Sequence, residues 1–380
     1  MSDSDSFGNF AARSSSKWRR FPEAVLPMHV AEMDFDVAGP ILDKLQQMVA
    51  NSDLGYLGPL PELEPAFSEF AAGRWGWQVK PGGIKLATDV GVAAVEILRA
   101  LGKPGQSVMI NSPVYSSFFK WIEEVGMVPY DAPLRENEGR WELDLRAIER
   151  GFEQGVEILL LCSPQNPVGT VHTPAELTEL ADLAQRYGAT VISDEIHAPL
   201  SFVPFTPYLS LGANAEQTGV TITSSSKAWN TAGLKAGFLI TQSEQMQQRL
   251  KKLPEAMNWR ASLLGAFSMV AAFSESVDWL NQTVLTIQDR HAFLLSQVAK
   301  HLPKAKVFEM EATYLAWLDL SAYRVGDLAG EILRGAQVAV VSGSEHSVGD
   351  GYPGFIRFNF ATSEARIAEA IRRISSLLEG

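Results

Sequence analysis

The amino-acid sequence predicts an α/β domain with a largely parallel sheet, joined to a smaller α+β domain. Three observations predict this fold class. Short apolar runs alternate with longer amphipathic runs through the middle of the chain. The C-terminal third changes to long helical patterns with a few strand-like runs. A length of 380 residues is also too great for one compact core, which favours two domains.

Four short buried strands are predicted in the first domain, because four runs are apolar and rich in leucine or β-branched residues. They are SVMI (107–110), VEILLLC (156–162), ATVIS (189–193) and VTIT (220–223). Helical patterns lie between these runs, and strands that alternate with helices form parallel sheets with crossover helices. We therefore expect a large domain over residues 51–255.

The helix between the second and third of these strands has clear signals at both ends. Its pattern covers residues 173–188, with Thr173 as the N-cap and Pro174 at the first helical position. Glu176 stands where its side chain can complete a capping box, and Gly188 follows the last turn. The sequence therefore predicts a helix from Pro174 to the residue before Gly188.

The C-terminal third predicts the smaller α+β domain. Long helical patterns at about 255–300 come first. They are followed by a strand-like run (314–320), a short helix (326–335), two more strand-like runs (337–343 and 355–360) and a final amphipathic helix. We expect the small domain to combine residues 1–50 with residues 256–380.

Charge and residue usage argue against several classes of function. The net charge is −12, whereas nonspecific nucleic-acid binding depends on an excess of Lys and Arg. The single cysteine, Cys162, cannot form an internal disulfide, and no Cys/His cluster has zinc-like spacing. No apolar stretch reaches about 18 residues, and the polar N-terminus lacks the apolar region of a secretory signal. We expect a cytoplasmic protein that binds no metal, nucleic acid or membrane.

Chemically capable side chains follow the predicted strands, at the sheet edge where ligands bind. Tyr115 follows the first strand, Asn166 the second, Asp194 and His197 the third, and Lys227 the fourth. Each of these residues also has a plain structural reading, such as a surface lysine, a helix cap or a turn asparagine. As a set, however, an aromatic ring, an amide, a carboxylate, an imidazole and a lysine match the parts of pyridoxal phosphate.

Each part of that cofactor would use one of these groups. Lys227 would form the Schiff base with the aldehyde. Asp194 would keep the pyridine nitrogen protonated, which lets the ring accept electrons. Asn166 or His197 would hydrogen-bond the phenolic oxygen, and Tyr115 would stack on the ring.

A helix N-terminus is expected to hold the phosphate. The segment LATDVGVAAVEILRAL (86–101) presents the N–H groups of Gly91 and Val92 at the start of a helix, with Asp89 or a neighbour as its cap. Two hydroxyls and a cation after the fourth strand are expected to add phosphate contacts: Ser224, Ser226 and Lys235.

Together these motifs resemble the fold-type-I pyridoxal-phosphate enzymes, the aspartate-aminotransferase superfamily. NPVG, SDEIH and SSSKAWNTAGLKAG resemble the family's asparagine, aspartate and lysine motifs. FIRFNFATS resembles the C-terminal motif whose arginine, here Arg357, holds the substrate α-carboxylate. A buried arginine also needs a partner, and a carboxylate can supply one. The resemblance spans nearly the whole chain and implies a mostly parallel, seven-stranded sheet.

Further details resemble the C–S β-lyase branch, which includes the cystathionine β-lyases. AEMDFDVAGPI (31–41) is similar to a segment typical of that branch. LGYLGPLPEL places Tyr56 where the family brings a tyrosine from the neighbouring subunit to the cofactor phosphate, which implies a homodimer. The branch usually has aspartate in place of Glu32 and histidine in place of Gln165. Neither residue is expected to carry the chemistry, but both could alter the substrate pocket.

The resemblance favours β-elimination from L-cystathionine or related cysteine S-conjugates, which yields a thiol, pyruvate and ammonia. Lys227 would remove the α-proton while Arg357 holds the carboxylate. Two other functions stay open. Return of the proton to the cofactor would make the protein an aminotransferase, and a regulatory interaction protein could retain the same fold.

Overall fold

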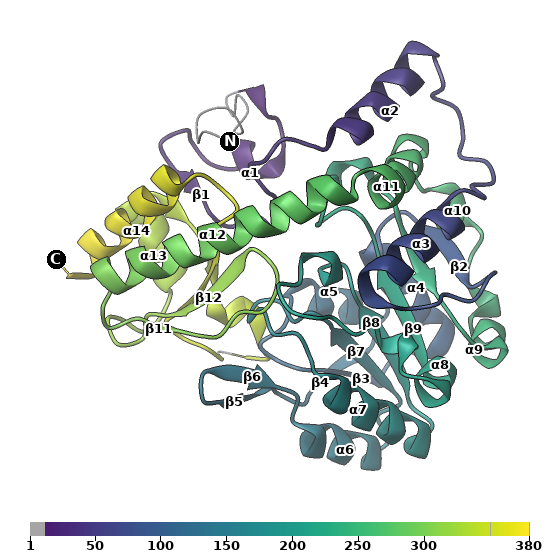
Figure 1. Ribbon diagram of the computed structural model, residues 1–380. Coiled ribbons are helices and arrows are strands. Elements are labelled where there is room, and N and C mark those ends of the chain that lie inside the picture. Colours follow the sequence, from purple (N-terminus) through teal and green to yellow (C-terminus); the bar gives the residue numbers. More distant parts are fainter. Residues whose placement is uncertain (1–11, 350, 380) are drawn as a thin grey trace.

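A seven-stranded sheet forms the centre of the computed structural model, which describes residues 12–349 and 351–379 (Figure 1). In spatial order its strands are β2 (Ile84–Ala87), β10 (Gly237–Ile240), β9 (Gly219–Thr223), β8 (Thr190–Asp194), β7 (Ile158–Cys162), β3 (Ser107–Ile110) and β4 (Val128–Asp131). Strand β10 runs antiparallel to both of its neighbours, and the other strands run parallel to one another. The predicted α/β fold with a mostly parallel, seven-stranded sheet is confirmed.

The four strands predicted from the sequence correspond to β3, β7, β8 and β9, within two residues at either end. Every residue of β7, β8 and β9 is buried, which explains why these strands are continuous apolar runs. The sequence does not predict the edge strands β2 and β4. Both are only partly buried, and β4 contains a proline and an aspartate, which are rare in strands.

Helices cover both faces of this sheet. On one face, α4 (Val90–Leu101) and α5 (Ser117–Glu124) pack with Val108 and Ile110 of β3. On the other face, α3 (Leu63–Trp75), α6 (Leu145–Glu153) and α7 (Pro174–Tyr187) pack with Met109 of the same strand. Helix α7 has the predicted capping box between Thr173 and Glu176. Shorter helices complete this part of the chain: α8 (Ala213–Thr218), α9 (Glu244–Arg249) and α10 (Ala256–Trp259).

A four-stranded antiparallel sheet forms the centre of the second part of the fold. Its spatial order is β11 (Lys306–Val307), β12 (Leu315–Asp319), β15 (Phe355–Asn359) and β14 (Val341–Ser342). The helices that accompany it are α12 (Val277–His301), α13 (Leu328–Ala336) and α14 (Glu364–Glu379). The run 337–343 was predicted as one strand, but it divides between β14 and β13 (Val338–Ala339), which pairs with β1 (Leu26–Pro27). The N-terminal segment therefore joins this second part of the fold.

The helices near the predicted boundary at residue 255 connect the two parts. Helix α11 (Leu263–Glu275) packs on both α2 (Gly39–Ala50) and α3, and the ring centroids of Phe67 and Phe273 lie 5.2 Å apart. Figure 1 shows α12 running from the end of α11 toward the second sheet. The seven strands lie inside 51–255, but α11 lies against them from outside that range, so the domain boundary stays a prediction.

In the described part of the chain, no single helix has both the length and the apolar character needed to cross a bilayer. The consecutive helices α11 and α12 meet those criteria only when taken together, and they are bent by 81° where they join.

Candidate active site

The carboxyl ends of β3, β7, β8 and β9 face a cavity of about 270 Å³. Most of the predicted site residues line this cavity, namely Gly91, Tyr115, Asn166, Asp194, His197, Ser226, Lys227 and Lys235. Parallel strands bring these residues together because their carboxyl ends share one edge of the sheet. Four other predicted residues do not line it: Val92, Ser224, Tyr56 and Arg357.

Lys227 follows β9 and reaches the cavity with its amine. The Lys227 Nζ donates a hydrogen bond to the backbone oxygen of Ala31, 3.0 Å away. Burial, and to a lesser degree the charge of Arg357, lower the pKa of Lys227 to about 8, against the opposing charges of Glu32 and Asp194. An amine with this pKa is partly neutral near neutral pH, as a nucleophile or general base must be.

Asp194 is the last residue of β8 and is buried beside the cavity. Burial raises the pKa of its carboxyl to about 7, against the opposing effects of the Ile196 N–H and the Lys227 charge. The one hydrogen bond recorded for this carboxylate comes from Ile196 N, at 3.1 Å, and no ion pair involves it within residues 12–349 and 351–379. A buried carboxylate with so few partners fits a cationic N–H group such as a protonated pyridine nitrogen.

Asn166 and Arg357 meet across the two sheets. Arg357 lies on β15 and donates from Nη1 to Asn166 Oδ1, 3.2 Å away, and from Nη2 to the His29 oxygen, 3.1 Å away. The Arg357 Nε is buried without a partner in the described residues. Because the Asn166 oxygen is already used, its amide N–H groups are left as donors toward the cavity that it lines.

His197 and Tyr115 line the same cavity as Asp194 and Asn166. His197 is buried, and its Nδ1 has no partner in the described residues. Burial lowers the pKa of His197 to about 3, helped by the charges of Lys227 and Arg357, so the imidazole is neutral. The Tyr115 ring lies edge-on to Trp121, with 5.8 Å between ring centroids.

The N-terminus of α4 forms the end of the cavity where an anion would bind. Asp89 is the N-cap, and its Oδ1 accepts from Val92 N at 2.9 Å. Its Oδ2 accepts from the Lys235 amine at 2.7 Å. Burial alone would raise the pKa of Asp89, but the hydrogen bonds from Lys235 and Val92 hold it below its usual value. Two groups predicted to bind phosphate, the Val92 N–H and Lys235, therefore already contact a carboxylate.

The serines before Lys227 divide between two roles. Ser226 lines the cavity. Ser224 instead donates its hydroxyl to the Ala236 oxygen, 2.6 Å away, and accepts from Ser226 N at 3.0 Å. Ser224 therefore ties the turn that carries Lys227 to the start of β10, and its predicted phosphate contact stays untested.

The two departures from the lyase branch lie close to the site. Gln165 is buried, and its Nε2 donates to the oxygens of Asn111 and Pro113 at 3.0 and 2.9 Å. It therefore supports the loop that leads to Tyr115. Glu32 accepts from the Ser15 hydroxyl at 2.6 Å and raises the pKa of Lys227 through its charge. Neither residue lines the cavity: Gln165 acts through the loop that it supports, and Glu32 acts through its charge.

Trp121 also lines the cavity, although the sequence does not single it out. A Cβ atom added to Gly91 would lie 3.0 Å from the Trp121 ring, so the absence of a side chain at Gly91 lets the indole pack at the start of α4. Trp121 lies in the amphipathic helix α5, where a tryptophan ordinarily reads as core. The signal in the sequence that could have indicated Trp121 as a site residue is its position, six residues after Tyr115.

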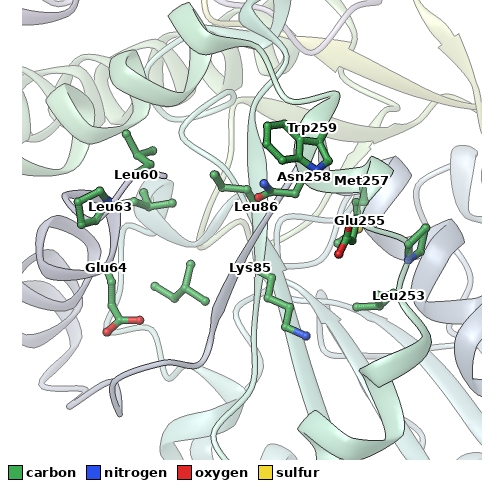
Figure 2. A pocket seen from close by; sticks show the side chains of 13 residues that line it. Leu60, Leu63, Glu64, Lys85, Leu86, Leu253, Glu255, Met257, Asn258 and Trp259 are labelled. Atoms are coloured by element: carbon green, nitrogen blue, oxygen red, sulfur yellow. The ribbon is translucent and has the colours of Figure 1, made fainter. Parts of the chain in front are cut away.

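Tyr56 lies away from the cavity and is 94% exposed. It belongs to the segment between α2 and α3, which also contributes to a second cavity, of about 690 Å³. Figure 2 shows this second cavity with Leu60, Leu63 and Glu64 on one side, Leu253, Glu255 and Met257 on the other, and Lys85 and Leu86 between them. Its lining mixes apolar side chains with Glu64, Lys85, Glu255 and Asn258, whereas the predicted site residues gather around Lys227, so we assign the chemistry to the cavity around Lys227.

Comparisons with known proteins show the family of this chain. Residues 25–374 match the family described as "Aminotransferase class I and II". A Mycobacterium leprae protein named "Putative cystathionine beta-lyase" is 38% identical, over 96% of this chain and 95% of the relative. Cystathionine beta-lyase of Corynebacterium glutamicum is 32% identical, and the match covers 96% of this chain and 97% of that relative.

A crystal structure from Corynebacterium diphtheriae, described as a "putative plp-dependent beta-cystathionase", has a TM-score of 0.91 and 34% identity, covering 99% of both chains. The family match covers most of the chain, and the relatives align over nearly their full length. This chain belongs to the aminotransferase class I and II family of pyridoxal-phosphate enzymes, in the branch that contains the cystathionine beta-lyases.

Proposed function

We propose that this protein is a pyridoxal-phosphate-dependent C–S β-lyase that cleaves L-cystathionine or a related cysteine S-conjugate to a thiol, pyruvate and ammonia. The convergence of Lys227 and Asp194 on one cavity, with Arg357 directly behind Asn166, carries the proposal. The relatives named as cystathionine beta-lyases support the choice of reaction and of sulfur substrate.

The residues around the cavity fit the cofactor. Lys227 would attach to its aldehyde, Asp194 would face its ring nitrogen, and Asn166 would donate to its phenolic oxygen. Tyr115 would cover the ring, while the start of α4 and Lys235 would hold the phosphate. When bound, pyridoxal phosphate supplies an aldehyde that takes up an amino group and a ring that accepts electrons from the substrate's α-carbon.

Arg357 and Lys227 have the main roles toward the substrate. Arg357 is buried, so an incoming α-carboxylate would pair with a guanidinium that is little hydrated, in the bidentate geometry that arginine favours. The Lys227 amine would remove the α-proton of the bound substrate. Its pKa of about 8 makes the neutral form available near neutral pH.

Transamination is the second candidate, because the family described as aminotransferase class I and II includes this chain. The two reactions begin with the same proton removal. They would differ in whether Lys227 gives that proton up again with the substrate's carbon–sulfur bond intact or a sulfur group leaves from the β-carbon.

The deciding experiment supplies the purified holoenzyme with L-cystathionine and no keto-acid acceptor, and follows pyruvate and free thiol. Many turnovers of both products would establish the lyase. At most one equivalent of keto acid, without thiol, would show an aminotransferase. Lys227→Ala is the control and should give neither product. A wild-type protein that binds the cofactor but gives no product would contradict the proposed substrate class.

We also propose that the enzyme is a cytoplasmic homodimer. The 94% exposure of Tyr56 supports this, since a tyrosine so exposed can reach a neighbouring copy of the chain. The cavity of Figure 2 lies beside the same segment and includes Trp259, which is 57% exposed. A single buried cysteine, which needs no oxidising compartment, is consistent with the cytoplasm.

A further inference from the structure

We propose that Asn230 is a positioning residue whose side-chain amide holds residues 31–35 as a roof over Lys227. The roof segment, defined here as residues 31–35, would keep water away from the reacting amine. The inference rests on the proposed function, because it assigns a role to the surroundings of the same lysine.

The Asn230 amide pairs with the backbone of the roof segment. Its Oδ1 accepts from Met33 N at 2.9 Å, and its Nδ2 donates to the Met33 oxygen at 2.9 Å. The same Nδ2 lies 3.4 Å from the oxygen of Phe35. One side chain thus satisfies both backbone groups of a fully buried residue, as a neighbouring β-strand would. These contacts fix both the position and the orientation of Met33.

Lys227 contacts the same segment two residues earlier. Its amine donates to the oxygen of Ala31, which lines the cavity. Lys227 and Asn230 are three residues apart in one turn, so this turn holds the roof segment at two points. A displacement of Met33 would therefore move the Ala31 oxygen away from the amine.

The backbone conformation of Asn230 would suit glycine at least as well as asparagine. Its φ is +58°, in the left-handed region that glycine occupies most readily. Asparagine tolerates this region better than most other residues but still less well than glycine. The hydrogen bonds to Met33 and Phe35 give a physical reason for an amide at this position.

Other elements hold the roof segment independently. The buried Lys17 donates to Asp34 Oδ1 at 2.6 Å and to the Glu32 oxygen at 2.9 Å. Asn359 Nδ2 also donates to the Glu32 oxygen, at 2.8 Å. Loss of the Asn230 amide should therefore loosen the segment locally and leave the fold intact.

The effect on Lys227 has a definite sign. Burial is the largest influence on its pKa and lowers it. The charged groups that face the amine are Arg357 and Lys235, which also lower the pKa, and Glu32 and Asp194, which raise it. A looser roof admits water and weakens the effect of burial, so the protonated form of the lysine nitrogen becomes more stable.

The test compares the wild-type holoenzyme with Asn230→Gly, which removes the amide and suits the left-handed backbone. The matched control is Glu138→Gly, because Glu138 has a φ of +50° in the exposed turn between β5 (Arg135–Asn137) and β6 (Arg140–Glu142). Amide hydrogen exchange of residues 31–35 should accelerate roughly tenfold or more in Asn230→Gly only. The pH midpoint of the cofactor's absorbance should also rise by roughly half a unit or more.

Both changes together support the proposal. Faster exchange with an unchanged pH midpoint would make Asn230 a structural tie only, and unchanged exchange would show that the amide does not hold the roof. Either result overturns the proposal. If Asn230→Gly fails to fold, Asn230→Ser removes the amide without adding a charge and carries the same measurements. Failure of the proposed function would appear separately, as absence of thiol and pyruvate from the wild-type enzyme.

Discussion

Asp89 and Lys235 form an ion pair at the start of α4, with 2.7 Å between the carboxylate oxygen and the amine. The cation expected to neutralise the cofactor phosphate is therefore already balanced by a carboxylate. The same carboxylate accepts the Val92 N–H. A dianionic phosphate at this helix end would lie next to a negative charge, which weakens its attraction to Lys235.

Asp89→Asn should therefore increase cofactor affinity. Asparagine keeps the N-cap hydrogen bond but removes the charge, so the Kd of the cofactor-free protein for pyridoxal phosphate should fall about fivefold at low salt. Fluorescence titration measures this Kd, and the gain should shrink at about 1 M salt because of screening. Weaker binding by Asp89→Asn would mean instead that Asp89 is needed to orient Lys235.

The sequence was sufficient to predict the parts of the site that follow buried strands. Asn166, Asp194 and Lys227 each come after an apolar run, and parallel strands place such residues at one edge. The contact between Lys227 and the Ala31 oxygen could not be predicted, because a backbone acceptor 196 residues away leaves no trace in residue type. The Asp89–Lys235 ion pair was not predicted, because the sequence assigns each residue a separate role: Asp89 caps a helix, and Lys235 is expected to contact the phosphate.

The same distinction applies to the fold. Strands β7, β8 and β9 are buried on both faces, so their sequences are unmistakably apolar. The run 337–343 looked like one strand, since nothing local shows that β13 pairs with β1 while β14 pairs with β15. Partners far away in the sequence, rather than local propensity, decided that division.

Asp194→Asn should stabilise the cofactor-free protein at neutral and higher pH. The folded-state pKa of Asp194 is raised to about 7, above its ordinary value of 3.8, so the folded state binds this proton more tightly than the unfolded state. The resulting stability is present below about pH 4 and is lost as the pH rises toward 7, by about 4 kcal/mol at most. The difference in Tm between the variant and the wild type should therefore grow from pH 5 to pH 8. Glu195 titrates in the same range but is common to both proteins, so a constant difference in Tm would contradict the assignment.

Arg357→Lys should weaken substrate binding more than it slows the chemistry. Lysine keeps the positive charge but cannot form two parallel hydrogen bonds with a carboxylate, so KM should rise roughly 30-fold or more while kcat changes less. Steady-state kinetics with L-cystathionine give both constants. The cofactor absorbance is the control, because Arg357 also contacts Asn166 and the His29 oxygen and its loss could disturb the cofactor. An unchanged KM with intact absorbance would remove Arg357 from the substrate site.

Tyr56 provides the sharpest test of the homodimer. If Tyr56 reaches the partner's phosphate site, Tyr56→Ala and Lys227→Ala should each be almost inactive alone. In a mixed dimer, the chain with Lys227 intact would receive Tyr56 from the other chain, so one complete site would form. Refolding an equal mixture should produce such dimers as about half of the population, and hence about a quarter of the wild-type activity per site. Size-exclusion chromatography confirms that the variants still associate. If Tyr56 served its own chain, every mixed dimer would lack a complete site and the mixture would show no activity beyond that of the two variants. If Tyr56 served neither site, Tyr56→Ala alone would keep its activity.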